Sequence, residues 1–78
     1  MTSPTNHNET SKKISIEKQN RIDAHKRIAS HLERAAKNHN DAAKYYEENN
    51  IEKAVMHASV ASEHLTKANE FFEEFLLG

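Results

Sequence analysis

The chain has 78 residues, with eleven basic and twelve acidic side chains. This length allows one small domain, which buries roughly 60% of the surface that the unfolded chain exposes. Marginal stability is therefore expected unless a partner, a metal ion or a second copy contributes. The absence of cysteine excludes disulfide scaffolds, thiolate metal sites and cysteine nucleophiles, and a net charge of −1 does not favour nucleic acid or an anionic membrane as a partner.

The first ten residues are polar and rich in Ser, Thr and Asn. They lack the apolar side chains that could offset the entropy lost on ordering, so we predict a disordered tail over residues 1–10. One domain, residues 11–78, follows it. No segment resembles a secretory signal or approaches the roughly 20 apolar residues of a membrane span. A cytoplasmic location without a membrane partner is therefore expected.

Two helices are predicted after this tail. Residues from about 12 to 48 have a helical pattern, with acid–base pairs four positions apart such as Glu17 and Arg21. The break falls at the Asn doublet, 49–50, because Asn tolerates the left-handed conformation at a helix end and is also a good N-cap. A second helix, about 51–76, then runs back. The predicted fold class is all-α, an antiparallel helical hairpin with an alanine-rich coiled coil.

Small apolar residues recur every seven positions on both helices, which is the spacing of a coiled coil. Folding at the Asn doublet places Leu32 opposite Leu65 and Ala36 opposite Ala61, and layers of Ala against Ala allow the backbones to approach closely. The predicted hairpin core consists of Ile22, His25, Ala29, Leu32, Ala36, His39, Ala43 and Tyr46 from the first helix and Ile51, Ala54, Ala58, Ala61, Leu65, Ala68, Phe72 and Phe75 from the second.

Alanine layers bury too little apolar area to stabilise such a hairpin alone, so a second surface should be covered. We predict an isologous homodimer that forms a four-helix bundle through the less polar flank. A helix of another protein in the same groove is one alternative, and residues 11–21 packing across the hairpin as a separate helix is another. The predicted interface residues are Ile28, Ala35, Ala42, Tyr45, His57, Val60, His64 and Phe71.

Six histidines are the unusual feature of the composition. Neutral imidazole is the commonest side-chain ligand of zinc, copper and nickel. His57 and His64 are about 10 Å apart along one helix, so one ion would need ligands from elsewhere as well. The candidate metal ligands are His31, His39, His57 and His64. The favoured interpretation is that the histidines are core-edge and interface residues, and a Zn, Cu or Ni site is the alternative.

The sequence shows no nucleophile with a base, no carboxylate pair and no glycine-rich phosphate loop, so we predict no catalytic or cofactor-binding residues and no enzyme activity. Residues 12–27 carry six basic and two acidic side chains, but no aromatic residues are interleaved, so nucleic-acid binding is not favoured. The expected function is non-catalytic self-association through protein–protein interaction or assembly. The alternative function is histidine-based transition-metal binding.

The stretch from His31 to Ala68 combines the units H-x3-AA-x2-H-x2-AA, EKA and HA-x2-A-x2-H. It resembles a group of short bacterial Ala/His-rich helical-hairpin proteins, which implies a hairpin fold and no particular activity. Asn38, Tyr45 and Tyr46 stand where that group tends to have further histidines, a departure that weighs against a shared metal role. A weaker similarity to a single tetratricopeptide-type hairpin, without the repeats of a solenoid, rests on the spacing of Ala42, Tyr45, Asn49, Ile51, Ala54, Ala58 and Ala61.

Overall fold

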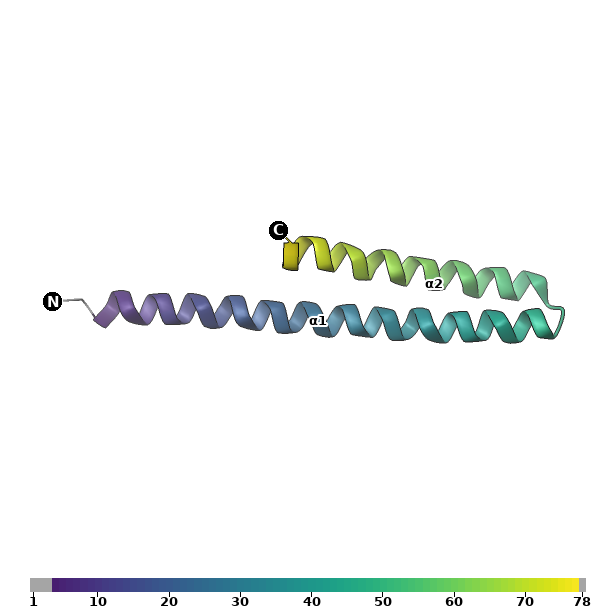
Figure 1. Cartoon of the computed structure of the whole chain (residues 1–78), viewed down its shortest axis with the longest axis horizontal. Helices are drawn as coiled ribbons and strands as arrows, with labels where there is room; N and C mark the ends of the chain where they lie inside the picture. Colours follow the sequence, from purple (N-terminus) through teal and green to yellow (C-terminus); the bar gives the residue numbers. More distant parts are fainter. Residues whose placement is uncertain (1–3, 78) are drawn as a thin grey trace.

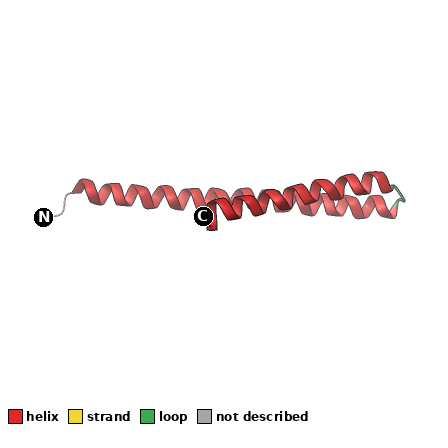
Figure 2. Ribbon diagram, turned by 90° about the horizontal axis from the view of Figure 1, so that it is seen from above, coloured by secondary structure: helices red, strands yellow, loops and turns green. Residues whose placement is uncertain are grey.

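Two antiparallel helices make up the described part of the chain (Figure 1). The structure is a computed structural model that describes residues 4–77, with side chains for residues 12–77. Helix α1 is Pro4–Glu47, helix α2 is Ile51–Phe72, and a π-helical turn, η1 (Glu73–Leu77), continues α2. The helices lie side by side in a thin rod of 74 × 16 × 11 Å (Figure 2). The predicted all-α helical hairpin is confirmed.

Helix α1 begins earlier than predicted. Of the predicted disordered tail, residues 1–3 lie outside the described residues, and residues 4–10 are the first turns of α1. Pro4 suits a first helical position, because its fixed φ is helical and its missing N–H would have no partner there. No glycine or proline follows until Gly78. The helix therefore continues unbroken through residues 11–21, which do not fold back across the hairpin as a separate helix.

The turn uses its two asparagines in the two predicted ways. Asn49 has a left-handed backbone with φ 62°, and its N–H donates to the carbonyl of Tyr46 at 3.0 Å. The N–H of Asn50 donates to the carbonyl of Tyr45 at 2.8 Å, which completes a Schellman arrangement at the end of α1. The side chain of Asn50 then accepts the backbone N–H of Lys53 at 3.3 Å and caps α2. Both predicted roles are confirmed.

Alanine lines the contact between the two helices. Among residues 12–77, the buried residues are Ala24, Ala35 and Ala42 from α1 and Ala54, Ala61 and Ala68 from α2. The three from α2 belong to the predicted core. Small side chains let two helices approach to the close end of the usual distance of about 8–10 Å. On α2 the predicted alanine row is therefore in the contact, whereas Leu65 and Phe72 of the second predicted row are exposed, and the neighbouring residues His64 and Phe71 pack against α1 instead.

The face of α1 that packs on α2 differs from the predicted one. Ala29, Ala36 and Ala43 are exposed, and Leu32 and Tyr46 are 45% and 48% exposed. The packed row is offset from the predicted row by one residue, which rotates α1 by about 100°. Both rows carry alanine at seven-residue spacing, so spacing alone did not separate them. The other exposed residues of the predicted core are Ile22, His25, His39, Ile51, Leu65, Phe72 and Phe75.

The N-terminal half of α1 extends beyond the end of α2 (Figure 1). Residues 12–23, which we call the free arm, are all exposed, and Ile14 and Ile16 are 60% and 61% exposed. The C-terminal end of the described chain lies beside the middle of α1. Despite the length of α1, no helix within residues 4–77 is apolar over enough residues to cross a membrane.

Candidate functional site

The residues predicted to form a dimer interface are covered within the single chain. Ala35 and Ala42 are only 2% and 5% exposed. The other six are half-buried: Ile28, Tyr45, His57, Val60, His64 and Phe71. This placement corrects the prediction that these residues form an edge left free for a second copy, because the chain's own helices pack on each other there. We call this contact between α1 and α2 the seam.

Two imidazole rings meet in the seam, one from each helix. The Nδ1 atoms of His31 and His64 are 2.9 Å apart, and the rings are tilted by 31° with their centroids 5.1 Å apart. At this distance one ring donates a hydrogen bond and the other accepts it. Phe71 stacks on His31 with the ring centroids 5.8 Å apart. We call these three residues the His64 layer, in which two polar atoms satisfy each other within an alanine-rich contact.

A second histidine layer lies nearer the turn. His57 donates its Nδ1–H to the Oδ1 atom of Asn38 at 2.9 Å and stacks on Tyr45 with the ring centroids 5.2 Å apart. The Oδ2 atom of Asp41 is 3.9 Å from the same nitrogen, so an ion pair forms when His57 is protonated. Asn38 was not among the predicted site residues. Its position seven residues after His31, on the same row of α1, is the signal that could have identified it.

The four predicted metal ligands do not gather at one point. His31 and His64 are together, whereas His57 lies in the other layer and His39 is exposed. In the part of the chain that the structure describes, no group of three or more His, Asp or Glu side chains is placed to hold one ion. The structure therefore brings together two of the four.

The pKa of the His31 imidazole is lowered from its ordinary value. The largest cause is its removal from water in the seam, and the positive charges of His64, Arg34 and Lys67 act in the same direction. Both causes disfavour the protonated ring. His31 is therefore neutral at neutral pH, with a nitrogen lone pair able to accept a hydrogen bond or to bind a metal ion.

Large apolar side chains remain uncovered on one side of the hairpin. In each helix, the residue that follows a seam residue is rotated by about 100° from the seam. Because the two helices are antiparallel, these following residues lie on the same side of the hairpin in both helices. Leu32, Tyr46, Leu65 and Phe72 are such residues, and they are 40–48% exposed. We define the open face as these four with Ile22 and Ile51, which are 37% and 53% exposed.

The opposite side of the hairpin is charged. The residues one position before seam residues include Arg27 and Lys53, and each lies over an aromatic ring of the seam. The Arg27 guanidinium carbon is 5.5 Å from the ring centroid of Phe71, and the Lys53 ammonium is 5.5 Å from that of Tyr45. Such cation–π contacts hold the charged groups at the rim of the seam. The two sides of the hairpin therefore differ in character, one apolar and one charged.

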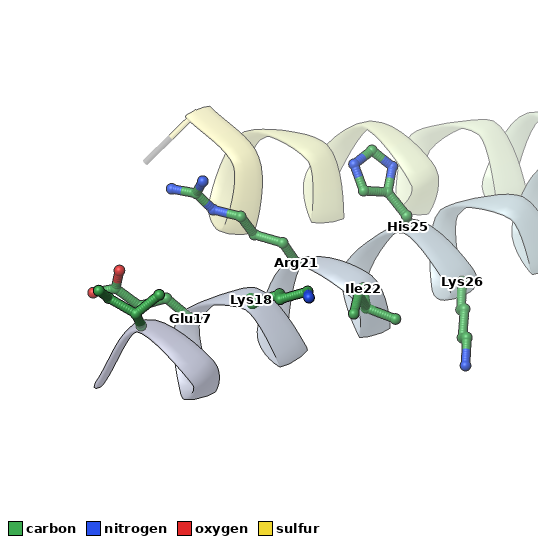
Figure 3. Close-up of a pocket in the computed structure, with 7 residues that line it drawn as sticks. Glu17, Lys18, Arg21, Ile22, His25 and Lys26 are labelled. Atoms are coloured by element: carbon green, nitrogen blue, oxygen red, sulfur yellow. The ribbon is translucent and has the colours of Figure 1, made fainter. Parts of the chain in front are cut away.

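A shallow groove of about 530 Å³ lies along the exposed N-terminal half of α1, as Figure 3 shows. Its lining comes from α1 alone, with His25 and Lys26 pointing to opposite sides of the helix. Ile22 of the open face is one of the lining residues, so the groove continues that face past the end of α2. The full lining is Ile14, Glu17, Lys18, Arg21, Ile22, His25 and Lys26.

Comparison with other proteins adds no relative from which a function could be transferred. No protein-family model, no curated protein and no solved structure matches the chain. What the chain does is therefore inferred from its own residues and their geometry.

Proposed function

We propose that the chain is a non-catalytic helical protein that acts by self-association, in which two hairpins pack open face against open face as a four-helix bundle. The observation that carries this proposal is the distribution of apolar side chains. Alanines occupy the seam, while larger residues such as Leu32, Leu65 and Phe72 stay 40–45% exposed. Soluble monomers rarely leave a contiguous apolar surface of this kind uncovered.

The energetic effect of covering the open face is substantial for so small a chain. Fully burying a large apolar side chain contributes about 1.5–3 kcal/mol, so burying the exposed half contributes on the order of 1 kcal/mol for each residue. A symmetric dimer covers the same residues on both copies, which doubles this contribution. The alanine seam has no comparable source of stability. Self-association therefore supplies apolar burial that the single hairpin lacks.

The opposite side of the hairpin is a poorer dimer surface. It carries charged side chains of both signs, among them Arg34, Lys67 and Glu63, and a contact between two copies there would remove these charges from water. The open face lacks acidic or basic side chains among its six defining residues. These charges support the open face as the contact between copies and leave the charged side in solvent.

The experiment is to measure molecular mass by size-exclusion chromatography with light scattering in the presence of a chelator. The wild-type chain is expected to elute with twice its own mass. Leu65→Glu places a charge on the open face and is expected to give a monomer. Thr66→Glu adds the same charge at the neighbouring exposed position, on the side of α2 that faces solvent, and is expected to remain a dimer.

Two results would contradict the proposal. One is a wild-type chain that stays monomeric as its concentration is raised. The other is an equal loss of mass in Leu65→Glu and Thr66→Glu, because it would show that added charge and not the open face determines association. Circular dichroism of both variants checks that each remains helical.

A further inference from the structure

The His64 layer contains two nitrogen atoms that converge from different helices and have no part in the proposed self-association. We infer that His31 and His64 together bind one divalent transition-metal ion, of the class of Zn²⁺, Cu²⁺ or Ni²⁺, through their Nδ1 atoms. Both ligands come from one chain. A single chain therefore supplies both protein ligands, whether it is a monomer or part of a dimer.

The distance between the two nitrogens is close to that of a metal chelate. Zinc–imidazole bonds are about 2.0–2.1 Å long, so two nitrogens on one tetrahedral ion are about 3.4 Å apart. The Nδ1 atoms of His31 and His64 are 2.9 Å apart. Both rings are half-buried, and small rotations about their side-chain bonds separate them by the remaining half ångström. Water molecules complete the coordination, as they do at metal sites with few protein ligands.

Metal binding requires a change of tautomer and not a loss of protons. In the hydrogen-bonded pair, one Nδ1 atom carries a proton and the other accepts it. When both rings carry their proton on Nε2, both Nδ1 lone pairs are free to bind the ion.

The charges around the layer limit the affinity. Arg34 and Lys67 are the positive groups near His31, and they oppose the approach of a cation. Replacing Lys67 with Gln removes one of these charges without touching either ligand. We therefore expect Lys67→Gln to bind the metal several-fold more tightly than the wild type, which distinguishes an ion at this layer from one held elsewhere on the chain.

An ion held in this way links α1 to α2. Because the unfolded chain does not bring the two rings together, binding stabilises the hairpin in proportion to the logarithm of the free metal concentration. Among the three metals, Cu²⁺ is expected to bind most tightly, following the general order for nitrogen ligands.

The test is a calorimetric titration of the chelator-free 78-residue chain with Zn²⁺, repeated with Cu²⁺. One ion per chain is expected. Replacing either ligand, in His31→Asn or His64→Asn, is expected to weaken binding by more than the roughly 10–100-fold that loss of an outer hydrogen-bond partner costs. His39→Asn is the matched control, because His39 is an exposed histidine of α1 outside the seam, and it is expected to bind as the wild type does.

Nitrogen NMR of the histidine rings tests the site without any substitution. Zinc is expected to shift the Nδ1 resonances of His31 and His64 and to leave those of His25 unchanged. The inference is overturned if the wild type binds no zinc, if both ligand variants bind as tightly as the wild type, or if His39→Asn loses binding to the same extent. The same titration in the Leu65→Glu variant is expected to give the same stoichiometry, whether or not that variant associates.

Discussion

The Nδ1 atoms of His31 and His64 lie 2.9 Å apart across the seam between α1 and α2. A hydrogen bond at this distance needs at least one ring without a proton on Nδ1. Protonating both rings would place two cations against each other in a contact lined by alanine. The pair therefore makes the packing of the two helices depend on the protonation of histidine.

The first prediction concerns the metal-free chain at low pH. The pKa of His31 is lower in the folded chain than in the unfolded chain, so the unfolded state binds more protons as pH falls through about 6.5. The contribution of His31 to stability is complete above the unfolded pKa, falls as the pH drops towards the folded pKa, and stays low beneath it. Urea unfolding in chelator at a series of pH values is expected to show decreasing stability over this range.

The control for this prediction is His31→Asn, which removes the titrating ring. Its stability is expected to depend less on pH than that of the wild type in the same range. If the two chains lose stability in parallel on acidification, other histidines are responsible, and the environment described for His31 does not control the transition.

The second prediction tests which face of α1 forms the seam. Ala35 is 2% exposed and Ala36 is exposed, although the two residues are adjacent and chemically identical. Ala35→Leu overpacks the seam and is expected to lower the free energy of unfolding by about 1–3 kcal/mol. Ala36→Leu places the same side chain outside the seam and is expected to avoid this cost. Urea unfolding of both variants at concentrations that keep the chain monomeric gives the comparison.

The opposite ranking of these two variants would restore the core rows predicted from spacing. A large destabilisation by Ala36→Leu together with a tolerated Ala35→Leu would mean that α1 is rotated by one residue from the arrangement described. The two variants have the same composition, so differences in helix propensity do not affect the comparison.

The third prediction concerns the cap of α2. Asn50→Ala removes the side-chain oxygen that accepts the backbone N–H of Lys53, and it is expected to lower the free energy of unfolding by about 0.5–2 kcal/mol. Asn50→Asp keeps an acceptor of equal capping strength and is expected to retain the stability of the wild type. Thermal unfolding followed by circular dichroism measures both. Equal stability of Asn50→Ala and the wild type would show that the cap contributes nothing in solution.

Much of the fold follows from local chemistry that is visible in the sequence. The lack of glycine and proline between Pro4 and Gly78 predicts long helices, and the doublet 49–50 predicts where the chain turns. Both predictions are confirmed by the structure. The start of α1 was harder to predict, because the polar composition of residues 4–10 is compatible with a disordered segment as well as with the helix that the structure shows.

The seam on α1 could not be chosen from seven-residue spacing alone. The row with Ala35 and Ala42 and the row with Ala36 and Ala43 differ by one position and have similar apolar content. The prediction placed Leu32 in the core, whereas the structure fully buries only alanines, packs His31 in the seam and leaves Leu32 at the side. Small residues allow the close approach of the helices, and this preference depends on both helices together.

The sequence predicted that histidines form the candidate site, but it did not predict which of them lie next to each other. His31 and His64 were both candidate ligands, and the structure brings them together. His39, another histidine of the first helix, is also a predicted ligand, yet the rotation of α1 places it outside the seam. The hydrogen bond between Asn38 and His57 follows from the same rotation. A rotation of α1 by one residue therefore determines which polar side chains lie opposite each other in the seam.

The unequal lengths of the helices affect how the protein can be labelled. Helix α1 has 44 residues and α2 has 22, so η1, which ends at Leu77, lies beside the middle of α1, while the turn between the helices lies at the tip of the rod (Figure 1). A fluorophore attached at Leu77 would therefore lie near the middle of the rod and not at either end of it. A bulky fusion placed there would project sideways, beside the point where the rod changes from two helices to one.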